Sequence, residues 1–205
     1  YLDMVKEYAV IYNGEMEEGY TPALYQNFPY YINPNFASGD LYFNNNLYTN
    51  QQLRLDLYKD ELIVLVPGKQ FNKIIDFHGV DKATIHGVTI VYKDKSSNLS
   101  SGYYIQLYTS SSMEMLQKIT AEIDKVNLGD KRSFKIKEQF YLIQKGKNPV
   151  IVKNKNTFIK LFPGYKKEIN SYIKQNNLKF SHNKAKSFAQ LAAYCHELTN
   201  LNPLL

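Results

Sequence analysis

The chain has 205 residues, a formal net charge of +6, 44% hydrophobic residues and 21% charged residues. This composition is typical of a globular protein, and we find no apolar run near the ~20 residues that a membrane-spanning helix needs. Its one cysteine, Cys195, excludes an internal disulfide and any multi-cysteine metal site. The four histidines are scattered, so we expect no imidazole-rich metal cluster and assign no cofactor.

Positive charge is concentrated in the last third of the chain. Residues 1–130 hold ten Lys and Arg against sixteen Asp and Glu, whereas residues 131–205 hold fifteen against three. The last third would therefore attract phosphate, anionic lipid or an acidic polymer, or could dock on the acidic part of the same chain. Only Arg54 and Arg132 are arginines. Because Lys cannot make the bidentate contacts by which Arg reads bases, we expect no specific DNA recognition.

Strands are expected over the first two-thirds, where Tyr, Phe and β-branched residues are frequent. A first strand is predicted at Val5–Tyr12, closed by the turn signal Asn13-Gly14. The stretch Tyr20–Phe36 contains three prolines and is predicted to be an ordered aromatic loop.

A meander of antiparallel strands is predicted next. Asn44-Asn45-Asn46 should join strands at Gly39–Phe43 and Leu47–Tyr48, because Asn tolerates positive φ. The alternation of leucine with polar residues from Leu53 to Leu57 predicts a strand with one buried face. Further strands are expected at Glu61–Val66, Phe71–Phe77 and Ala83–Tyr92, with a turn near Gly79-Val80-Asp81. The Ser-rich loop Lys93–Gly102 is the best candidate for a boundary between regions.

Helices are expected only near the end of the chain. Tyr103–Tyr108 is predicted to be a strand, Met115–Ile123 fits either a strand or a short helix, and Gln139–Gln144 with Pro149–Val152 should form a hairpin. The hydrophobic period then becomes helical. We predict a short helix with Thr157 as N-cap, a longer one beginning at Pro163, and a last one from Asn183 that carries Phe188, Leu191, Ala192, Cys195 and Leu198 on one stripe.

These elements predict an α+β fold. An antiparallel β-rich N-terminal body, either a meander or a partly open barrel, would be followed by a β-hairpin and C-terminal helices. Residues 1–95 would form the β-rich region, and residues 103–205 the hairpin with the helices, packed as one unit with the first.

Two stretches carry a resemblance to a known family. The first runs from Gly39-Asp40-Leu41-Tyr42-Phe43 through Leu47-Tyr48 to Leu53–Leu62, and the second comprises Gln139–Lys155, Phe158–Phe180 and the closing helix to Leu198. Together they resemble a family of exported, uncharacterised proteins of Bacteroidota, from which the break at Pro163-Gly164 departs. The resemblance implies an extracytoplasmic location, in the periplasm, on the outer-membrane surface or secreted, and implies no known activity. The chain starts at Tyr1 rather than Met, so we expect a leader or another segment to have been removed, and a secretory signal peptide is one alternative for it.

The densest group of titratable residues comprises Asp76, His78, Asp81 and His86. On a strand, Asp76 and His78 share a face, and His86 could return beside them from the next strand. Asp76, His78 and His86 could then bind a divalent metal or perform acid–base chemistry. In the plainer alternative, the aspartates serve the turn at Gly79 and the histidines are half-exposed strand residues.

The aromatic loop is a second candidate site. Its rings could stack on a sugar or another ligand, with Tyr25, Tyr30 and Tyr31 as the binding residues. Alternatively they cover an open end of the sheet and complete the core.

Two further groups are interpreted as structural. Asp56, Asp60 and Glu61 crowd one turn but lack the ligand spacing of a calcium loop, so we interpret them as solvated turn acids. Cys195 and His196 are neighbours on a helix and therefore point about 100° apart, so they do not form a nucleophile–base pair. We expect Cys195 to be a buried, inert thiol.

The lysines of the last third lie mostly off the apolar stripe, on a solvated helix face that could bind an anionic polymer or lipid headgroups. They are Lys160, Lys166, Lys167, Lys174, Lys179, Lys184 and Lys186. We interpret the chain as an exported, non-enzymatic binding or structural interaction protein of the bacterial cell envelope, with no catalytic residue. One alternative is a hydrolase or metal-dependent enzyme using Asp76, His78 and His86. The other is binding of an anionic polymer or nucleic acid through the lysine-rich last third.

Overall fold

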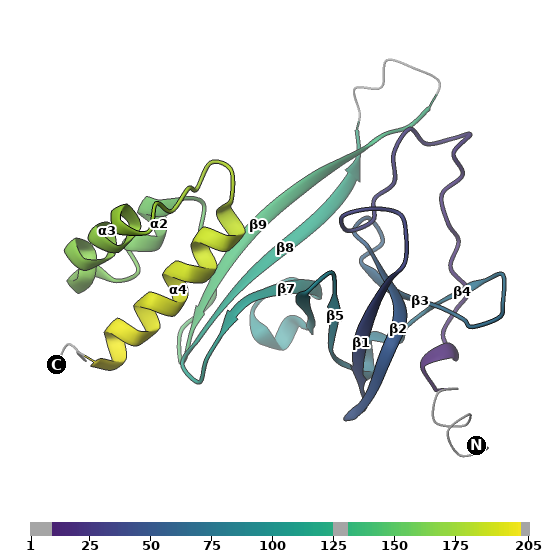
Figure 1. Ribbon diagram of the computed structural model, residues 1–205, viewed down its shortest axis with the longest axis horizontal. Helices are drawn as coiled ribbons and strands as arrows, with labels where there is room; N and C mark the ends of the chain where they lie inside the picture. Colours follow the sequence, from purple (N-terminus) through teal and green to yellow (C-terminus); the bar gives the residue numbers. More distant parts are fainter. Residues whose placement is uncertain (1–9, 125–130, 202–205) are drawn as a thin grey trace. The chain divides into compact units, whose positions relative to one another are not determined.

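The computed structural model describes residues 10–124 and 131–201, in which ten strands form one open antiparallel sheet accompanied by C-terminal helices (Figure 1). The strand order is β10-β9-β8-β7-β6-β5-β1-β2-β3-β4. Most neighbours in the sheet are therefore also neighbours in sequence, as in a meander. The predicted α+β class, with an antiparallel body followed by helices, is confirmed.

The elements have the following bounds. The strands are β1 (Ala37–Phe43), β2 (Asn46–Asp56), β3 (Glu61–Leu65), β4 (Asn72–Ile74), β5 (Val80–Ile85), β6 (Val88–Lys93), β7 (Gly102–Thr109), β8 (Met113–Ile123), β9 (Phe134–Gln144) and β10 (Val150–Ile151). The α-helices are α2 (Lys155–Ile159), α3 (Lys166–Gln175) and α4 (Lys184–Leu201). Short 3-10 turns are η1 (Val10–Tyr12), η2 (Phe77–Gly79), η3 (Lys95–Ser97) and η4 (Pro163–Tyr165).

The chain divides into two compact units. Unit 1 comprises residues 1–104 and 119–138, and unit 2 comprises residues 105–118 and 139–205. The predicted division at 95–103 differs from this, because β8 and β9 are long enough to contribute to two cores. Ala121 and Phe134 belong to the core of unit 1, whereas Met115 and Phe140 belong to that of unit 2.

Two tight turns shape the sheet of unit 1. Asn44 and Asn45 join β1 to β2 with φ of 50° and 62°, as predicted. His86 and Gly87 join β5 to β6 with φ of 53° and 75°. The single strand predicted at 83–92 is therefore wrong: a two-residue turn with positive φ at both positions makes a hairpin there.

The N-terminal strand prediction is also wrong where it can be checked. Val10–Tyr12 is a 3-10 turn, and residues 5–9 lie outside the described residues. Of the strand predicted at 71–77, only Asn72–Ile74 pairs with β3. The alternation along β2 is as predicted, since Leu53 and Leu55 are buried in the unit 1 core.

The core of unit 2 is formed by strand residues packed against all three helices. Met113 and Met115 from β8 and Phe140 and Leu142 from β9 join Phe158, Ile169, Phe188, Leu191 and Cys195. Residues 115–123 are thus part of a strand, which resolves the ambiguity of the sequence pattern. The N-cap of α2 is Asn154 rather than the predicted Thr157. Asn154 Oδ1 accepts from Thr157 N, and Thr157 Oγ1 accepts from Asn154 N, in a reciprocal capping box.

Phe188 is the side chain on which we expect unit 2 to depend most. It is fully buried, with ring centroids of Phe140, Phe158 and Phe180 at 5.0, 6.0 and 5.1 Å. Phe188→Ala should lower the free energy of unfolding by about 3–5 kcal/mol, because it leaves a cavity among these rings. Chemical denaturation monitored by circular dichroism would measure this. The control Ile151→Ala, at a side chain that is 41% exposed, should cost less than about 1 kcal/mol; equal losses would contradict the assignment.

Candidate functional site

The histidine–aspartate group predicted from the sequence is only partly brought together. Asp76 precedes η2, and its Oδ1 accepts from the backbone N–H of His78 and lies 2.8 Å from His78 Nδ1. These hydrogen bonds lower the pKa of Asp76. Both side chains are largely exposed, at 61% for Asp76 and 76% for His78. We had expected the pair to lie on one face of a strand. That prediction is wrong, because residues 77–79 form a 3-10 turn.

His86 lies apart from this pair. It follows the last residue of β5, whereas Asp76 and His78 precede the first, and six strand residues span about 20 Å. The ring of His86 lies next to that of Tyr31, and the two ring centroids are 6.4 Å apart. Asp81 Oδ2 accepts from the backbone N–H of Asn45, so it serves the β1–β2 turn, whereas the plainer alternative placed it at the turn of Gly79. Among residues 10–124 and 131–201, no three His, Cys, Asp or Glu side chains are grouped so that they could hold a metal ion.

The aromatic loop packs onto unit 1, with Tyr20 near its centre. The Tyr20 ring meets Tyr25, Tyr30 and Phe134 edge-on at 5.3, 5.6 and 5.1 Å. Tyr25 lies flat on Phe134, with ring centroids 5.1 Å apart. Tyr30 is buried, whereas Tyr31 is half-buried against the core. Of the three tyrosines predicted to bind a ligand, Tyr25 and Tyr30 therefore both contact Tyr20, whereas Tyr31 lies against His86.

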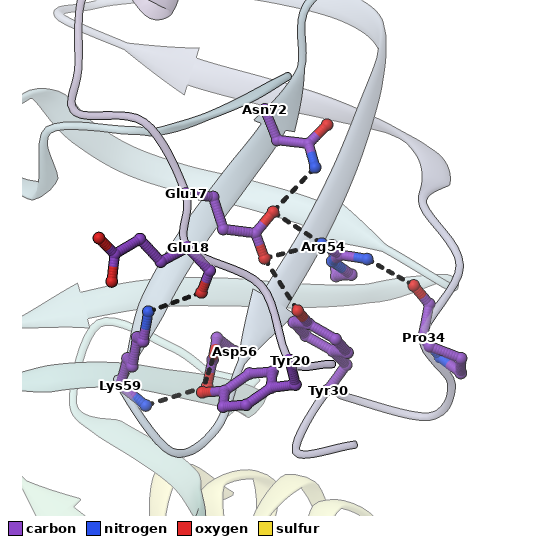
Figure 2. A network of polar contacts seen from close by, with 9 residues as sticks. All are labelled: Glu17, Glu18, Tyr20, Tyr30, Pro34, Arg54, Asp56, Lys59 and Asn72. Atoms are coloured by element: carbon purple, nitrogen blue, oxygen red, sulfur yellow. Dashed lines mark hydrogen bonds and ion pairs between the residues drawn. The ribbon is translucent and has the colours of Figure 1, made fainter. Parts of the chain in front are cut away.

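A buried ion pair anchors this loop, as Figure 2 shows. Both carboxylate oxygens of Glu17 lie 2.7 Å from Nη2 of Arg54 on β2. The remaining acceptor positions of Glu17 are used by Tyr30 Oη at 2.9 Å and Asn72 Nδ2 at 2.9 Å. The side chains of Glu17 and Arg54 are only 2% and 12% exposed. Three side chains donate to this deeply buried carboxylate, which offsets the cost of removing it from water.

The guanidinium of Arg54 is held between two rings. Its central carbon lies 3.9 Å from the centroid of Tyr30 and 4.2 Å from that of Phe36, and Nη1 donates to Pro34 O at 2.7 Å. Three points of the loop are thus attached to one side chain of β2. No sequence signal indicated this arrangement, because Glu17 stands in an ordinary acidic stretch 37 residues before Arg54.

Asp56 forms a second anchor at the end of β2 (Figure 2). Its Oδ2 accepts from Tyr20 Oη at 2.7 Å, and its Oδ1 accepts from the backbone N–H groups of Tyr58 and Lys59. Burial raises the pKa of Asp56, against the lowering effect of these hydrogen bonds. Burial is also the main cause that raises the pKa of Tyr20, followed by Asp56 itself. Asp56 therefore serves the turn, as predicted, and also fixes the aromatic loop. The prediction that it is solvated is wrong, because its side chain is buried under this loop.

We expect Arg54→Lys to be strongly destabilising although it keeps the charge. Lysine cannot bind Glu17 through a planar guanidinium and cannot stack between Tyr30 and Phe36. The free energy of unfolding should fall by about 2–4 kcal/mol, from lost charge-assisted hydrogen bonds and cation–π contacts. Arg132→Lys is the matched control, since Arg132 is exposed and only its backbone pairs with the loop, at Leu24 and Gln26. If the two variants unfold at the same denaturant concentration, the anchor is not important for stability.

Cys195 and His196 have separate surroundings. Cys195 is fully buried in the core of unit 2, and burial raises the pKa of its thiol to about 12. His196 is held at both ring nitrogens, by Tyr108 Oη at 2.8 Å and Asn200 Nδ2 at 3.0 Å. The thiol thus lacks the environment of a nucleophile.

Labelling should show that Cys195 is inert. Because the native thiol is buried and protonated at neutral pH, reaction with a disulfide reagent such as DTNB should be slow, and it should become fast in denaturant. Free cysteine at the same pH is the reference. Rapid, stoichiometric labelling of the native protein would contradict this assignment.

The lysines of unit 2 include a group on one face of α3. Lys166, Lys167 and Lys174 are exposed there and, together with Asn170 and Ser171, line a shallow hollow of about 520 Å³. The adjoining face of α3 is buried through Ile169 and Ile173. The hollow lies on a single helix, so it is a surface rather than an enclosed pocket.

No protein-family model, curated protein or solved structure matches this chain.

Proposed function

We propose that the chain is a non-enzymatic interaction protein of the bacterial cell envelope, and that unit 2 binds an anionic polymer through exposed lysines. The observation that carries this proposal is the charge of unit 2. Residues 105–118 and 139–205 contain twelve Lys, no Arg and three Asp or Glu, a formal net charge of +9. Nine of these lysines are exposed: Lys145, Lys147, Lys153, Lys160, Lys166, Lys167, Lys174, Lys179 and Lys186.

The face of α3 is the part of unit 2 best arranged for this role. Positions 166, 167, 170, 171 and 174 fall within an arc of about 140° on a helix, so three ammonium groups and two uncharged polar side chains point the same way. Within the described parts of the chain, Lys166, Lys167 and Lys174 form no ion pair. They are therefore available to a polyanion at little desolvation cost.

The type of basic residue indicates what kind of polymer is bound. Lysine is a hydrated point charge that attracts phosphate, sulfate or carboxylate without fixing their geometry. Binding by lysines alone should follow the charge density of the polymer and weaken steeply with salt, because it releases counterions. The envelope location is supported by the resemblance of Gly39–Leu62 and Gln139–Leu198 to exported proteins. No helix among the described residues is long and apolar enough to cross a membrane.

The enzymatic alternative has less support. Asp76 and His78 contact each other, but they are exposed and His86 lies beyond the other end of β5. Acid–base catalysis needs groups that converge on one reacting atom, and this arrangement brings only two of the three together.

Heparin affinity across a salt series tests the proposal. Replacing Lys166, Lys167 and Lys174 by Gln should reduce the slope of log affinity against log salt by about 2–3, since each lost phosphate-like contact removes roughly 0.7–0.9. Soluble dextran, which is uncharged, should not bind. Duplex DNA of two unrelated sequences should bind equally or not at all.

A matched triple variant separates a specific face from net charge. Lys69, Lys95 and Lys135 are exposed lysines of unit 1, and changing all three to Gln removes the same charge. This control should leave the salt slope unchanged. An equal loss in both triple variants, or retention of the wild type that does not depend on salt, would refute binding through α3.

A further inference from the structure

The β9–β10 hairpin of unit 2 forms an open border of the sheet. β10 consists of Val150 and Ile151 and is the last strand in the sheet order. It pairs with β9 at Leu142 and Tyr141. Among the residues that the structure describes, no further strand pairs with the other edge of β10. The two side chains of β10 therefore lie at the rim of unit 2.

This rim is apolar. Val150 and Ile151 are 40% and 41% exposed, whereas the next residue, Val152, is 1% exposed and belongs to the core of unit 2. Only the last of three successive β-branched residues is therefore used by the core. Isolated exposed aliphatic side chains are common on protein surfaces, but these two are adjacent. Because successive side chains of a strand point to opposite faces, apolar surface borders the open edge on both sides.

Positive charge surrounds this apolar rim. Residues 139–167 contain seven lysines and no Asp or Glu. Lys145 and Lys147 in the turn and Lys153 after β10 flank the exposed pair, and all three are exposed. Within residues 10–124 and 131–201 these three lysines form no ion pair. Their charges are therefore available to an anionic partner.

The combination of charge and apolar surface favours a lipid bilayer over a soluble polymer. A hydrated polyanion would pair with the ammonium groups but would leave Val150 and Ile151 in water. An anionic bilayer presents charged headgroups directly above an apolar layer. Lysine suits this boundary, because its alkyl stem can lie along apolar surface while the ammonium group stays among the headgroups.

We propose that the β9–β10 hairpin docks reversibly on the surface of an anionic lipid bilayer. Val150 and Ile151 enter the boundary between headgroups and acyl chains, and Lys145, Lys147 and Lys153 lie on the headgroups. The contact is peripheral, since a two-residue strand can reach only the outer part of the bilayer. This inference rests on the hairpin and does not depend on the lysines of α3.

Cosedimentation with lipid vesicles tests the electrostatic part. The full chain should bind phosphatidylcholine vesicles that contain about one third phosphatidylglycerol, and should not bind pure phosphatidylcholine. Replacing Lys145, Lys147 and Lys153 by Gln should weaken binding by about a hundredfold, because each lysine near an anionic surface contributes about fivefold.

The triple Gln variant of α3 removes the same charge and is the matched control. It should weaken vesicle binding by less than about tenfold, since its lysines lie outside the hairpin. An equal loss in both triple variants, or no binding of the wild type to anionic vesicles, would overturn the proposal.

Substitution of the apolar pair tests insertion. Thr is β-branched and suits a strand, so changing both Val150 and Ile151 to Thr should preserve the hairpin. This variant should bind anionic vesicles about tenfold more weakly, because less apolar surface leaves water, and should bind heparin as the wild type does. Unchanged vesicle binding would refute insertion, and an equal loss of heparin affinity would mean that the partner is a polymer.

The control for this variant changes two aliphatic strand residues of unit 1. Leu47 and Ile136 are 48% and 49% exposed, and replacing both by Thr should leave vesicle binding unchanged. A loss equal to that of the hairpin variant would show that the contact is not specific to β10.

A fluorescent reporter gives a direct readout of the contact. The chain contains no Trp, so Ile151→Trp introduces a single indole at the rim. Its emission should shift to shorter wavelength when anionic vesicles are added, because the ring leaves water, whereas Ile136→Trp in unit 1 should show no shift. An unchanged Ile151→Trp spectrum while the protein is bound to the vesicles would show that the hairpin does not contact lipid.

Discussion

The conformation of unit 1 depends on how Arg54 and Glu17 satisfy each other inside the protein. Burying two charges costs more than their attraction returns unless the surrounding groups complete the hydrogen bonding. Here Tyr30 and Asn72 donate to the carboxylate, and the guanidinium stacks between Tyr30 and Phe36, although Arg54 Nε is buried without a hydrogen-bond partner among the described residues. Such a pair contributes less to net stability than to specificity, because only one position of the loop fulfils all these contacts. With the loop so placed, Ile74 N–H donates to Glu15 O and Glu17 N–H donates to Asn72 O, which covers part of the β4 edge with backbone pairing.

The sequence predicted what is local and missed what is distant. The Asn44-Asn45 turn and the alternation from Leu53 to Leu57 are properties of adjacent residues, and both are found. The hairpin at His86-Gly87 was missed because its flanking residues are apolar on both sides, which resembles one continuous buried strand. The Glu17–Arg54 pair joins a loop to a strand, and neither residue type nor spacing distinguishes it from solvated charges. The site prediction failed for the same reason. His86 was placed beside Asp76 by counting along strands, and the turn at 77–79 together with the hairpin removes that register.

Acidic groups are treated in three ways within unit 1, and the differences indicate their roles. Glu17 and Asp56 are buried and receive hydrogen bonds from several donors, which is how structural carboxylates are held. Asp76 and Asp81 are exposed and accept from backbone N–H groups at turns. Glu61 is partly buried, and its Oε2, like Arg54 Nε, is buried without a hydrogen-bond partner among the described residues.

Arginine and lysine are used at different places in this chain, according to whether the geometry of the contact matters. Arg54 lies where geometry matters, since its planar fork meets a carboxylate and two ring faces in a space that solvent hardly reaches. Unit 2 contains no arginine, and nine of its lysines are exposed. A surface of ammonium groups on flexible side chains does not impose a geometry on its partner, and these groups stay hydrated at little cost in free energy. It is suited to a polymer that presents repeated negative charge rather than a defined shape, and this explains how one chain can combine a geometrically exact interior contact with a surface that selects by charge alone.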